Sequence, residues 1–491
     1  MKKYLAKGYV ESYYLPVILF AICFSWRFLH ILDRDICLDE PFTIYYAQKS
    51  ITDIILLTIN GEPTPPLFMM MVHGWIKLFG ISALPLRLLP LLFSSLTLVL
   101  IYRSVQKLSG VYAALISSTL FLFSSLHFYF ALEVRTYSLV SFFTVLIYYL
   151  YILLIQNEQK RYLVLFIIIA NIGLLMSHYF GGLVIANEVF FFLFFFNNKV
   201  LRKKIVTILI ATLILCLPIL YLLVKQYLVS SQGTWIPPMG EGQYPYFIYF
   251  FLNDVKVAKV IECILLFGAI IFIYDRVKKR SNLSTLKFPL LLVLCFVFPY
   301  TVMYILSYKS PMFIERYILF NSISLYLFIG ILIGKFFNNY WNLQLASLLL
   351  ISVGMYKSMF INSKSFYYRE VKNAVNESLK YHDVHTLIFI HPEWNKLEFS
   401  YHFNQSLFKN INKVQDDLLN AKNIFPVFSM DRAVEVIKDK YDSIKTVVFY
   451  TDGTDFTNVK IPLDTFSNFT RVDSVFYPQC LHVLVYKKIV K

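Results

Sequence analysis

Charged residues are scarce in this sequence. They make up 15% of its 491 residues, whereas hydrophobic residues make up 58%. A soluble domain carries about 25% charged residues, so the composition excludes an ordinary soluble protein for most of the chain. The six cysteines have no metal-binding spacing, which argues against a cysteine-based zinc module. No internal repeat is visible, although many transporter folds are built from repeats.

Hydrophobic residues are gathered in long runs. A bilayer core about 30 Å thick needs roughly 20 apolar residues per helix. The runs do not alternate with a period of two, so each is predicted to be a helix whose backbone groups are bonded internally. We identify eleven such runs, at residues 14–32, 84–104, 111–130, 137–155, 162–177, 180–197, 205–224, 258–274, 287–307, 317–334 and 341–360.

The formal net charge of +16 is explained by membrane topology and requires no nucleic-acid partner. Basic residues precede the first run and follow every second run, which is the pattern of cytoplasmic loops. We therefore predict a cytoplasmic N-terminus and an extracytoplasmic C-terminal segment in a multi-pass protein of the cell membrane. These basic residues are Lys2, Lys3, Lys7, Arg103, Lys107, Lys160, Arg161, Lys199, Arg202, Lys203, Lys204, Arg276, Lys278, Lys279, Arg280 and Lys335.

The composition changes abruptly after residue 361, which divides the chain into two predicted domains. Residues 1–361 form a mainly α polytopic bundle of about eleven transmembrane helices, and residues 362–491 form an extracytoplasmic α/β domain. Within the first domain, the outer loop 33–83 is predicted to carry two surface helices. In the second domain we expect helices near 366–381 and 431–441, and strands at Thr386–His391, Thr446–Tyr450 and His482–Tyr486.

Acidic, basic and imidazole side chains collect in the connections predicted to lie outside the membrane. Four connections supply them, whereas the inner face carries almost exclusively lysine and arginine. Ionisable groups this close to lipid are costly unless they have a partner or a function. The candidate site residues are Asp39, Glu40, Glu133, Arg135, Tyr137, His178, Lys309 and Arg316.

This mixture suits a donor whose tail lies in lipid and whose phosphate lies at the surface. Arginine binds phosphate with a rigid fork of donors. A carboxylate can take the proton of an acceptor hydroxyl that attacks a sugar carbon, while cations stabilise the departing phosphate. Structural roles are the alternatives: Asp39 as a helix cap, Glu133 paired with Arg135, His178 bonded to a carbonyl, and Arg316 in a loop-end pair.

Several ordered motifs resemble those of bacterial relatives of protein O-mannosyltransferases and of the lipid A aminoarabinose transferase, which are membrane glycosyltransferases of the C-type fold. The resemblance covers residues 1 to about 335. Its motifs are Leu38-Asp39-Glu40-Pro41-Phe42-Thr43, Thr64-Pro65-Pro66-Leu67, Trp75-Ile76-Lys77-Leu78-Phe79-Gly80, Arg87, Glu133-Val134-Arg135-Thr136-Tyr137, Ser177-His178-Tyr179-Phe180-Gly181 and Glu315-Arg316-Tyr317.

The resemblance implies a polyprenyl-phosphate-linked sugar as donor and transfer with inversion at the sugar. It implies Asp39 as the catalytic base, with Glu40 orienting it or a metal. Arg135 and Arg316 would contact the donor phosphate, and His178 would contact donor or metal. We also expect Lys309 among the donor-phosphate contacts, and Glu133 and Tyr137 among the contacts to substrate or metal. Many relatives have a histidine directly before the paired prolines where this chain has Thr64, so a divalent metal is left open as a cofactor.

Sequence reasoning leaves two other classes of function. A polytopic transporter or lipid flippase would also carry charges at the membrane, but such proteins commonly show repeats and polar groups near the midplane. A non-catalytic assembly protein of envelope synthesis would not need the retained acids and arginines. The sugar remains undetermined, as does the acceptor, which could be a lipid, a glycan or a protein.

Overall fold

The computed structural model describes residues 14–230, 236–278, 282–367, 369–452, 468–479 and 481–489. They fall into two compact units. The first, which we call the helical unit, comprises Met1–His30, Ile55–Phe68 and Arg87–Ser363. The second, the sheet unit, comprises Ile31–Ile54, Met69–Leu86 and Lys364–Lys491. Thus two pieces of the predicted outer loop 33–83 belong to the same unit as the C-terminal segment. Lys2, Lys3 and Lys7 lie outside the described residues.

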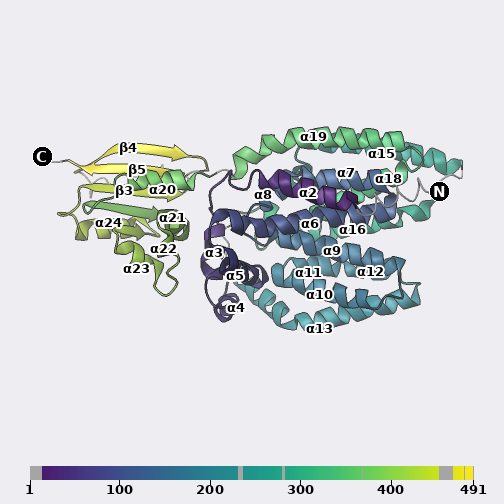
Figure 1. Ribbon diagram of the computed structural model, residues 1–491, viewed down its shortest axis with the longest axis horizontal. Helices are drawn as coiled ribbons and strands as arrows, with labels where there is room; N and C mark the ends of the chain where they lie inside the picture. The colour runs from purple at the N-terminus through teal and green to yellow at the C-terminus, as the bar shows by residue number, and fades with distance from the viewer. Residues whose placement is uncertain are drawn as a thin grey trace. The chain divides into compact units, whose positions relative to one another are not determined.

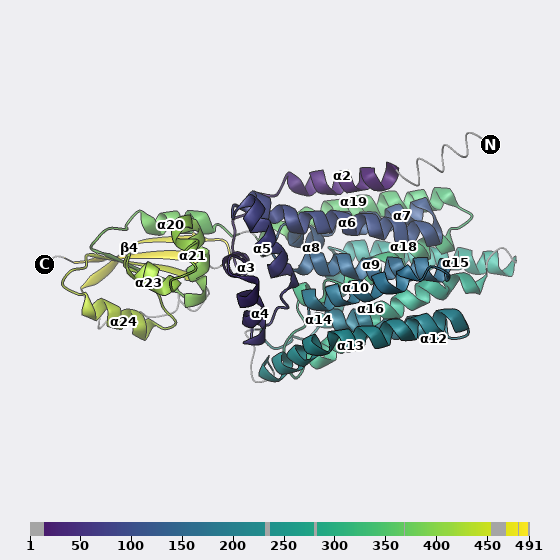
Figure 2. The same cartoon turned by 60° about the horizontal axis from the view of Figure 1, so that its bottom comes forward.

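Every predicted apolar run coincides with a helix or with consecutive helices, which run side by side in both views (Figure 1, Figure 2). The helices of this unit are α2 (Leu15–Phe28), α6 (Ala83–Ser109), α7 (Val111–Leu122), α8 (Ser125–Phe130), α9 (Tyr137–Gln156), α10 (Tyr162–Ser177), α11 (Gly181–Ala186), α12 (Glu188–Phe194), α13 (Lys199–Ser230), α14 (Gln243–Phe251), α15 (Val255–Val277), α16 (Lys287–Leu306), α17 (Glu315–Ile318), α18 (Asn321–Phe336) and α19 (Trp341–Tyr367).

By length and composition, five helices among the described residues are able to cross a membrane, and several shorter apolar helices accompany them. The five begin at Ala83, Tyr137, Lys199, Val255 and Leu283. The span that begins at Leu283 includes a short 3-10 turn before α16. Together with their many lipid-compatible exposed side chains, these helices make the chain a membrane protein, as the composition predicts.

Small residues allow helices of the bundle to approach closely. A Cβ atom at Gly330 of α18 would lie 2.7 Å from the carbonyl oxygen of Ala113 in α7, and one at Gly334 would lie 2.6 Å from the Ala113 Cβ. The Ser117 hydroxyl of α7 donates a 2.8 Å hydrogen bond to the carbonyl of Tyr326. Close backbone approach and interhelical hydrogen bonds are the main sources of helix association in lipid, where burial of apolar surface contributes little.

The sheet unit is built around five strands in the order β2-β1-β3-β5-β4. β1 pairs in parallel with β2 and β3, whereas β5 pairs antiparallel with β3 and β4. The strands are β1 (Thr386–His391), β2 (Ile424–Pro426), β3 (Thr446–Asp452), β4 (Phe469–Tyr477) and β5 (Leu481–Lys488). The three predicted strands are confirmed as β1, β3 and β5. The short β2 and the edge strand β4, in which only Phe469 is buried, were not predicted.

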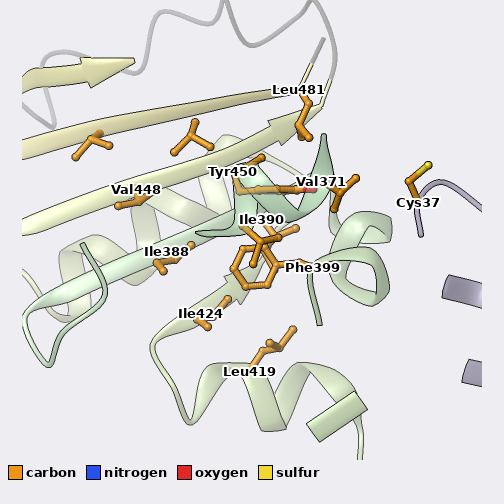
Figure 3. Packing of buried hydrophobic residues seen from close by; sticks show 14 residues of the cluster. Cys37, Val371, Ile388, Ile390, Phe399, Leu419, Ile424, Val448, Tyr450 and Leu481 are labelled. Carbon is orange, nitrogen blue, oxygen red and sulfur yellow. The ribbon is translucent and has the colours of Figure 1, made fainter. Parts of the chain in front are cut away.

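Helices cover both faces of this sheet. Leu387 and Phe389 point to one face, where α24 (Met430–Asp439) packs, and Ile388 and Ile390 point to the other. That second face packs against α20 (Val371–Leu379), α21 (Lys396–Phe403) and α23 (Gln415–Asn420), as Figure 3 shows. Successive residues of a strand face opposite sides, so a strand buried on both faces is continuously apolar. α20 and α24 confirm the predicted helices; α21 and α23 were not predicted.

The segment after α2 forms three short helices: α3 (Glu40–Ala47), α4 (Ile51–Ile59) and α5 (Leu67–Phe79). α4 and α5 are the two surface helices predicted from the sequence. Gly61 and Gly80 follow them with φ of 126° and 76°, conformations that glycine adopts without steric cost. α3 was not predicted.

Candidate active site

The sheet unit contains the two adjacent acids that follow the first apolar run. Asp39 is the N-cap residue of α3 and is half-buried, whereas the side chain of Glu40 is fully buried. A carboxylate oxygen of Glu40 accepts a 3.3 Å hydrogen bond from the backbone N–H of Cys37. We call residues 36–40 the acid loop. Within it, Glu40 has a structural role in the turn, and Asp39 is the more accessible carboxylate.

The acid loop also contacts residues that lie far along the sequence. The backbone N–H of Leu38 donates a 2.7 Å hydrogen bond to the carboxylate of Glu398 in α21. Glu398 in turn accepts a 2.8 Å hydrogen bond from the Tyr450 hydroxyl and pairs with Arg369 at 3.2 Å. Sequence reasoning missed Glu398, Arg369 and Tyr450, because no motif in residues 362–491 marks them.

The helical unit brings a second set of predicted residues together. Arg135 and Arg316 both lie close enough to the His178 ring to affect its ionisation. Tyr137 is within electrostatic range of the same two arginines and of Glu133. The His178 ring centre lies 6.3 Å from that of Tyr137 and 5.4 Å from that of Tyr317. We call Glu133, Arg135, Tyr137, His178, Arg316 and Tyr317 the arginine cluster.

Hydrogen bonds between helix ends position Arg135. The turn that carries it begins with a 2.7 Å bond from its own N–H to the Glu133 carbonyl. The next residue, Thr136, occupies the N-cap position of α9, and its hydroxyl donates a 2.9 Å hydrogen bond to the carbonyl of Ser177 at the end of α10. This bond fixes the start of α9 beside the residue that precedes His178.

A tight reversal of the chain positions His178. Helix α10 ends at Ser177, and His178 has extended backbone geometry. Its Nδ1 accepts a 3.2 Å hydrogen bond from the N–H of Phe180, so Nε2 carries the proton of the neutral ring. A Cβ at Gly181, where α11 starts, would lie 2.7 Å from the Leu174 Cγ, so the reversal needs glycine there.

The loop between α16 and α17 positions Arg316. The Ser307 hydroxyl at the end of α16 accepts hydrogen bonds from the N–H groups of Met312 and Phe313, at 2.7 and 3.0 Å. The chain then turns into α17, where the Arg316 guanidinium lies 5.6 Å from the centre of the Tyr317 ring. Tyr317 also contacts His178. Arg316 therefore reaches the imidazole from the connection between α16 and α18, whereas Arg135 reaches it from the connection between α8 and α9.

Burial and two neighbouring cations disfavour a positive charge on His178. Burial has the largest effect, followed by the charges of Arg135 and Arg316, and together they lower the pKa of His178 to about 3. The imidazole is therefore neutral at physiological pH and leaves the two guanidinium groups as the positive charges of the cluster. Next to it, burial and the nearby Glu62 raise the pKa of Tyr179 to about 12, so this phenol also stays neutral. Sequence reasoning did not select Glu62.

Lys309 is not joined to the cluster by any contact that the described residues show. Its side chain is exposed, and its backbone N–H donates to the Leu306 carbonyl at 3.1 Å. Its predicted contact with a donor phosphate thus gains no support from the geometry of the cluster.

A metal site would need several oxygen, nitrogen or sulfur ligands around one point. Within the described parts of the chain, no three His, Cys, Asp or Glu side chains are arranged to hold a metal ion.

Part of the chain matches a known protein family, and several solved structures are similar to the whole fold. Residues 63–222 match the family described as Dolichyl-phosphate-mannose-protein mannosyltransferase. No curated protein sequence matches significantly. Among solved structures, ArnT from Cupriavidus metallidurans in the apo state is similar with a TM-score of 0.60 and 12% identity, covering 98% of both chains. The same protein bound to undecaprenyl phosphate is similar with a TM-score of 0.58, 11% identity and 98% coverage of both chains.

A third similar structure is an Archaeoglobus fulgidus oligosaccharyltransferase tethered to an acceptor peptide. Its TM-score is 0.51 and its identity is 11%, with 90% of this chain and 70% of that chain covered. At these identities the likeness establishes the fold. The chain has the fold of the C-type membrane glycosyltransferases, as the motifs predicted, and its C-terminal end forms an α/β unit, as the change in composition predicted.

Proposed function

We propose that this protein is a membrane glycosyltransferase that moves a sugar from a polyprenyl-phosphate carrier to an acceptor hydroxyl. The observation that carries the proposal is the convergence of Arg135 and Arg316 on one neutral histidine, in a chain with the C-type fold. Two fixed cations at the ends of apolar helices suit a ligand with a lipid tail and a phosphate head. The match to a dolichyl-phosphate-mannose-protein mannosyltransferase family and the likeness to a protein that binds undecaprenyl phosphate support the same ligand class.

In the proposed reaction, Asp39 acts as general base. It takes the proton of the acceptor hydroxyl as the hydroxyl oxygen attacks the anomeric carbon of the sugar. The bond between that carbon and the phosphate oxygen breaks, and its electron pair leaves with the phosphate. Attack from the side opposite the leaving group inverts the configuration at the anomeric carbon. The partial exposure of Asp39 leaves its carboxylate accessible to a hydroxyl, whereas Glu40 is buried in the turn.

Arg135 and Arg316 stabilise the departing phosphate in this proposal. Guanidinium groups keep their charge at all relevant pH values and bind two phosphate oxygens at once. A neutral His178 can donate a further hydrogen bond through Nε2, and Tyr137 and Glu133 complete the arginine cluster around it. Lys309 is assigned no contact with the phosphate.

We place the reaction on the extracytoplasmic side of the cell membrane, in envelope synthesis. The support is the alternation of basic loops, which assigns the connections containing Asp39, Arg135, His178 and Arg316 to the outer side. Nucleotide sugars are absent there, so a lipid-linked donor suits the compartment. The acceptor is a hydroxyl of a lipid, a glycan or a protein.

Donor binding and turnover test the proposal separately. Undecaprenyl phosphate should stabilise the purified protein against thermal unfolding, and Arg135→Gln with Arg316→Gln should abolish that shift. Arg432→Gln, which alters an exposed pair with Glu435, is the matched control and should leave the shift unchanged. Absence of any shift with the wild-type protein would refute the donor class.

Mass spectrometry of envelope lipids and glycans tests turnover in cells. Comparison of strains with and without the gene should reveal one missing sugar, and Asp39→Asn should reproduce the loss. Asp53→Asn changes an exposed acid that accepts a hydrogen bond from Ser50 and should restore the sugar. Full sugar transfer by Asp39→Asn would remove Asp39 as the base.

A further inference from the structure

The carboxyl end of the parallel strands in the sheet unit holds a segment of the same chain. In α/β folds, this edge of a sheet is where ligands commonly bind. Here β1 ends at His391 and β3 at Asp452, next to the first residue of β5, Leu481. Figure 3 shows Cys37 of the acid loop on the side of the core cluster where Val371 and Leu481 lie.

Consecutive residues of the acid loop are each held by the C-terminal part of the chain. The carbonyl of Ile36 lies 2.7 Å from Nε2 of His402. The Cys37 side chain is 1% exposed and belongs to the core cluster that contains Tyr450 and Leu481. The N–H of Leu38 donates to Glu398 at 2.7 Å. The residue that follows is Asp39.

The backbone at Leu38 has a conformation that leucine rarely adopts. Its φ of 56° lies in the left-handed region, which is sterically unfavourable for a residue with a Cβ atom. Such a conformation persists where surrounding contacts determine it. Of the contacts to Leu38, the hydrogen bond to Glu398 is well suited to do so, because it is charge-assisted and links the strained residue to a buried helix.

Glu398 is itself fixed from two further sides. It is 2% exposed, and its other carboxylate oxygen receives the Tyr450 hydroxyl at 2.8 Å and lies 3.2 Å from Arg369. Arg369 is also 2% exposed and is anchored by Asp452 at 2.8 Å. A buried carboxylate held by a cation and a hydroxyl is fixed in position, so its remaining oxygen presents a rigid acceptor to the Leu38 N–H.

We propose that Glu398 is a positioning residue that locks the acid loop onto the C-terminal α/β domain and thereby sets the orientation of Asp39. This inference rests on the proposed function of Asp39 and gives the C-terminal domain a role in it. Glu398 does not touch the reacting atoms; it acts through the Leu38 backbone. The domain contributes to the transferase reaction by ordering the base.

The Cys37 thiol provides a test that does not depend on activity. In the full-length protein, the rate of maleimide labelling at Cys37, mapped by peptide mass spectrometry, reports how often the acid loop leaves the domain. A lost hydrogen bond to a charged group shifts such an opening equilibrium roughly 10- to 100-fold. We therefore expect Glu398→Ala to accelerate labelling at Cys37 by at least about tenfold. Glu398→Gln retains a carbonyl acceptor for Leu38 and should recover part of the protection.

General destabilisation of the domain is controlled by Ile437→Ala. Ile437 is a buried residue of α24, in the core on the opposite face of the sheet, and its truncation lowers stability without touching the acid loop. It should lower the melting temperature and leave Cys37 labelling close to the wild-type rate. Equal labelling of Glu398→Ala, Ile437→Ala and the wild-type protein would overturn the proposal.

Kinetics then separate this inference from the proposed function. With a polyprenyl-phosphate sugar that the wild-type protein turns over, Glu398→Ala should lower kcat about tenfold or more and leave binding of undecaprenyl phosphate unchanged. A parallel loss of donor binding would contradict a role through Asp39. If the wild-type protein transfers no sugar, the proposed function fails, while the labelling result still decides whether Glu398 holds the acid loop.

Discussion

The hydroxyl of Thr136 donates a 2.9 Å hydrogen bond to the carbonyl of Ser177, joining the start of α9 to the end of α10. Both residues are buried, and each is adjacent in sequence to a member of the arginine cluster, Arg135 or His178. The spacing of these two side chains therefore depends on one side-chain hydroxyl. By joining the two helices, this hydrogen bond fixes the position of the backbone that carries Arg135.

Thr136→Val should loosen the arginine cluster. It removes the hydroxyl at nearly constant volume and leaves the buried Ser177 carbonyl without this donor, at a cost of about 1–3 kcal/mol in the free energy of unfolding. Binding of undecaprenyl phosphate should weaken. Thr144→Val is the matched control, because the Thr144 hydroxyl bonds within its own helix to the Val140 carbonyl at 2.8 Å. Equal effects of the two variants on ligand binding would contradict the positioning role.

Acid should destabilise the protein through His178. Its pKa is about 3 in the folded state and about 6.5 when unfolded, so the unfolded chain binds more protons between these values. The stabilisation is complete above pH 6.5 and is lost as the pH falls towards 3. Without ligand, the wild-type melting temperature should therefore fall more between pH 7.5 and 5 than that of His178→Gln. Parallel curves would show that His178 titrates normally.

Gly181→Ala should disturb the reversal that follows α10. The added Cβ would lie 2.7 Å from the Leu174 Cγ and 3.0 Å from its carbonyl oxygen, so the turn must shift. Overpacking of this kind costs about 1–3 kcal/mol and would displace His178. Thermal unfolding measures the loss. Gly74→Ala in α5, where no atom lies within 4 Å of the added Cβ, should be neutral or stabilising.

Arg316→Lys should weaken donor binding although it keeps the charge. Lysine lacks the planar fork that binds two phosphate oxygens and stacks on Tyr317, 5.6 Å away. We expect roughly tenfold weaker binding of undecaprenyl phosphate by titration, equivalent to about 1.4 kcal/mol. The control variant Arg432→Lys, which changes an exposed residue, should bind undecaprenyl phosphate with wild-type affinity. Unchanged affinity of Arg316→Lys would indicate that charge alone suffices.

Leu38→Gly should partly rescue the loss of Glu398. Glycine adopts a φ of 56° without the steric cost that leucine bears. In the double variant with Glu398→Ala, the acid loop should therefore keep its turn more often, and Cys37 labelling should be slower than in Glu398→Ala alone. The comparison uses the same maleimide assay. Faster labelling in the double variant would show that backbone strain at Leu38 does not oppose the turn.

Local patterns in the sequence predicted most of the secondary structure. The apolar runs became helices at their predicted places because a helix satisfies its backbone groups within one segment. Thr386–His391 became β1 with its predicted bounds because it is apolar on both faces. β4 was not predicted because only Phe469 of this edge strand is buried and the strand carries polar residues such as Arg471 and Asp473.

The sequence by itself determined that the chain is a helical membrane protein with a C-terminal α/β segment, and it selected Arg135, His178 and Arg316. Hydrophobicity and residue chemistry are properties of short segments and can be read from them. Only the tertiary structure decided that Leu38 is held by Glu398, 360 residues later, and that Glu40 is buried rather than accessible. Such contacts arise from the packing of distant elements, which no local pattern encodes.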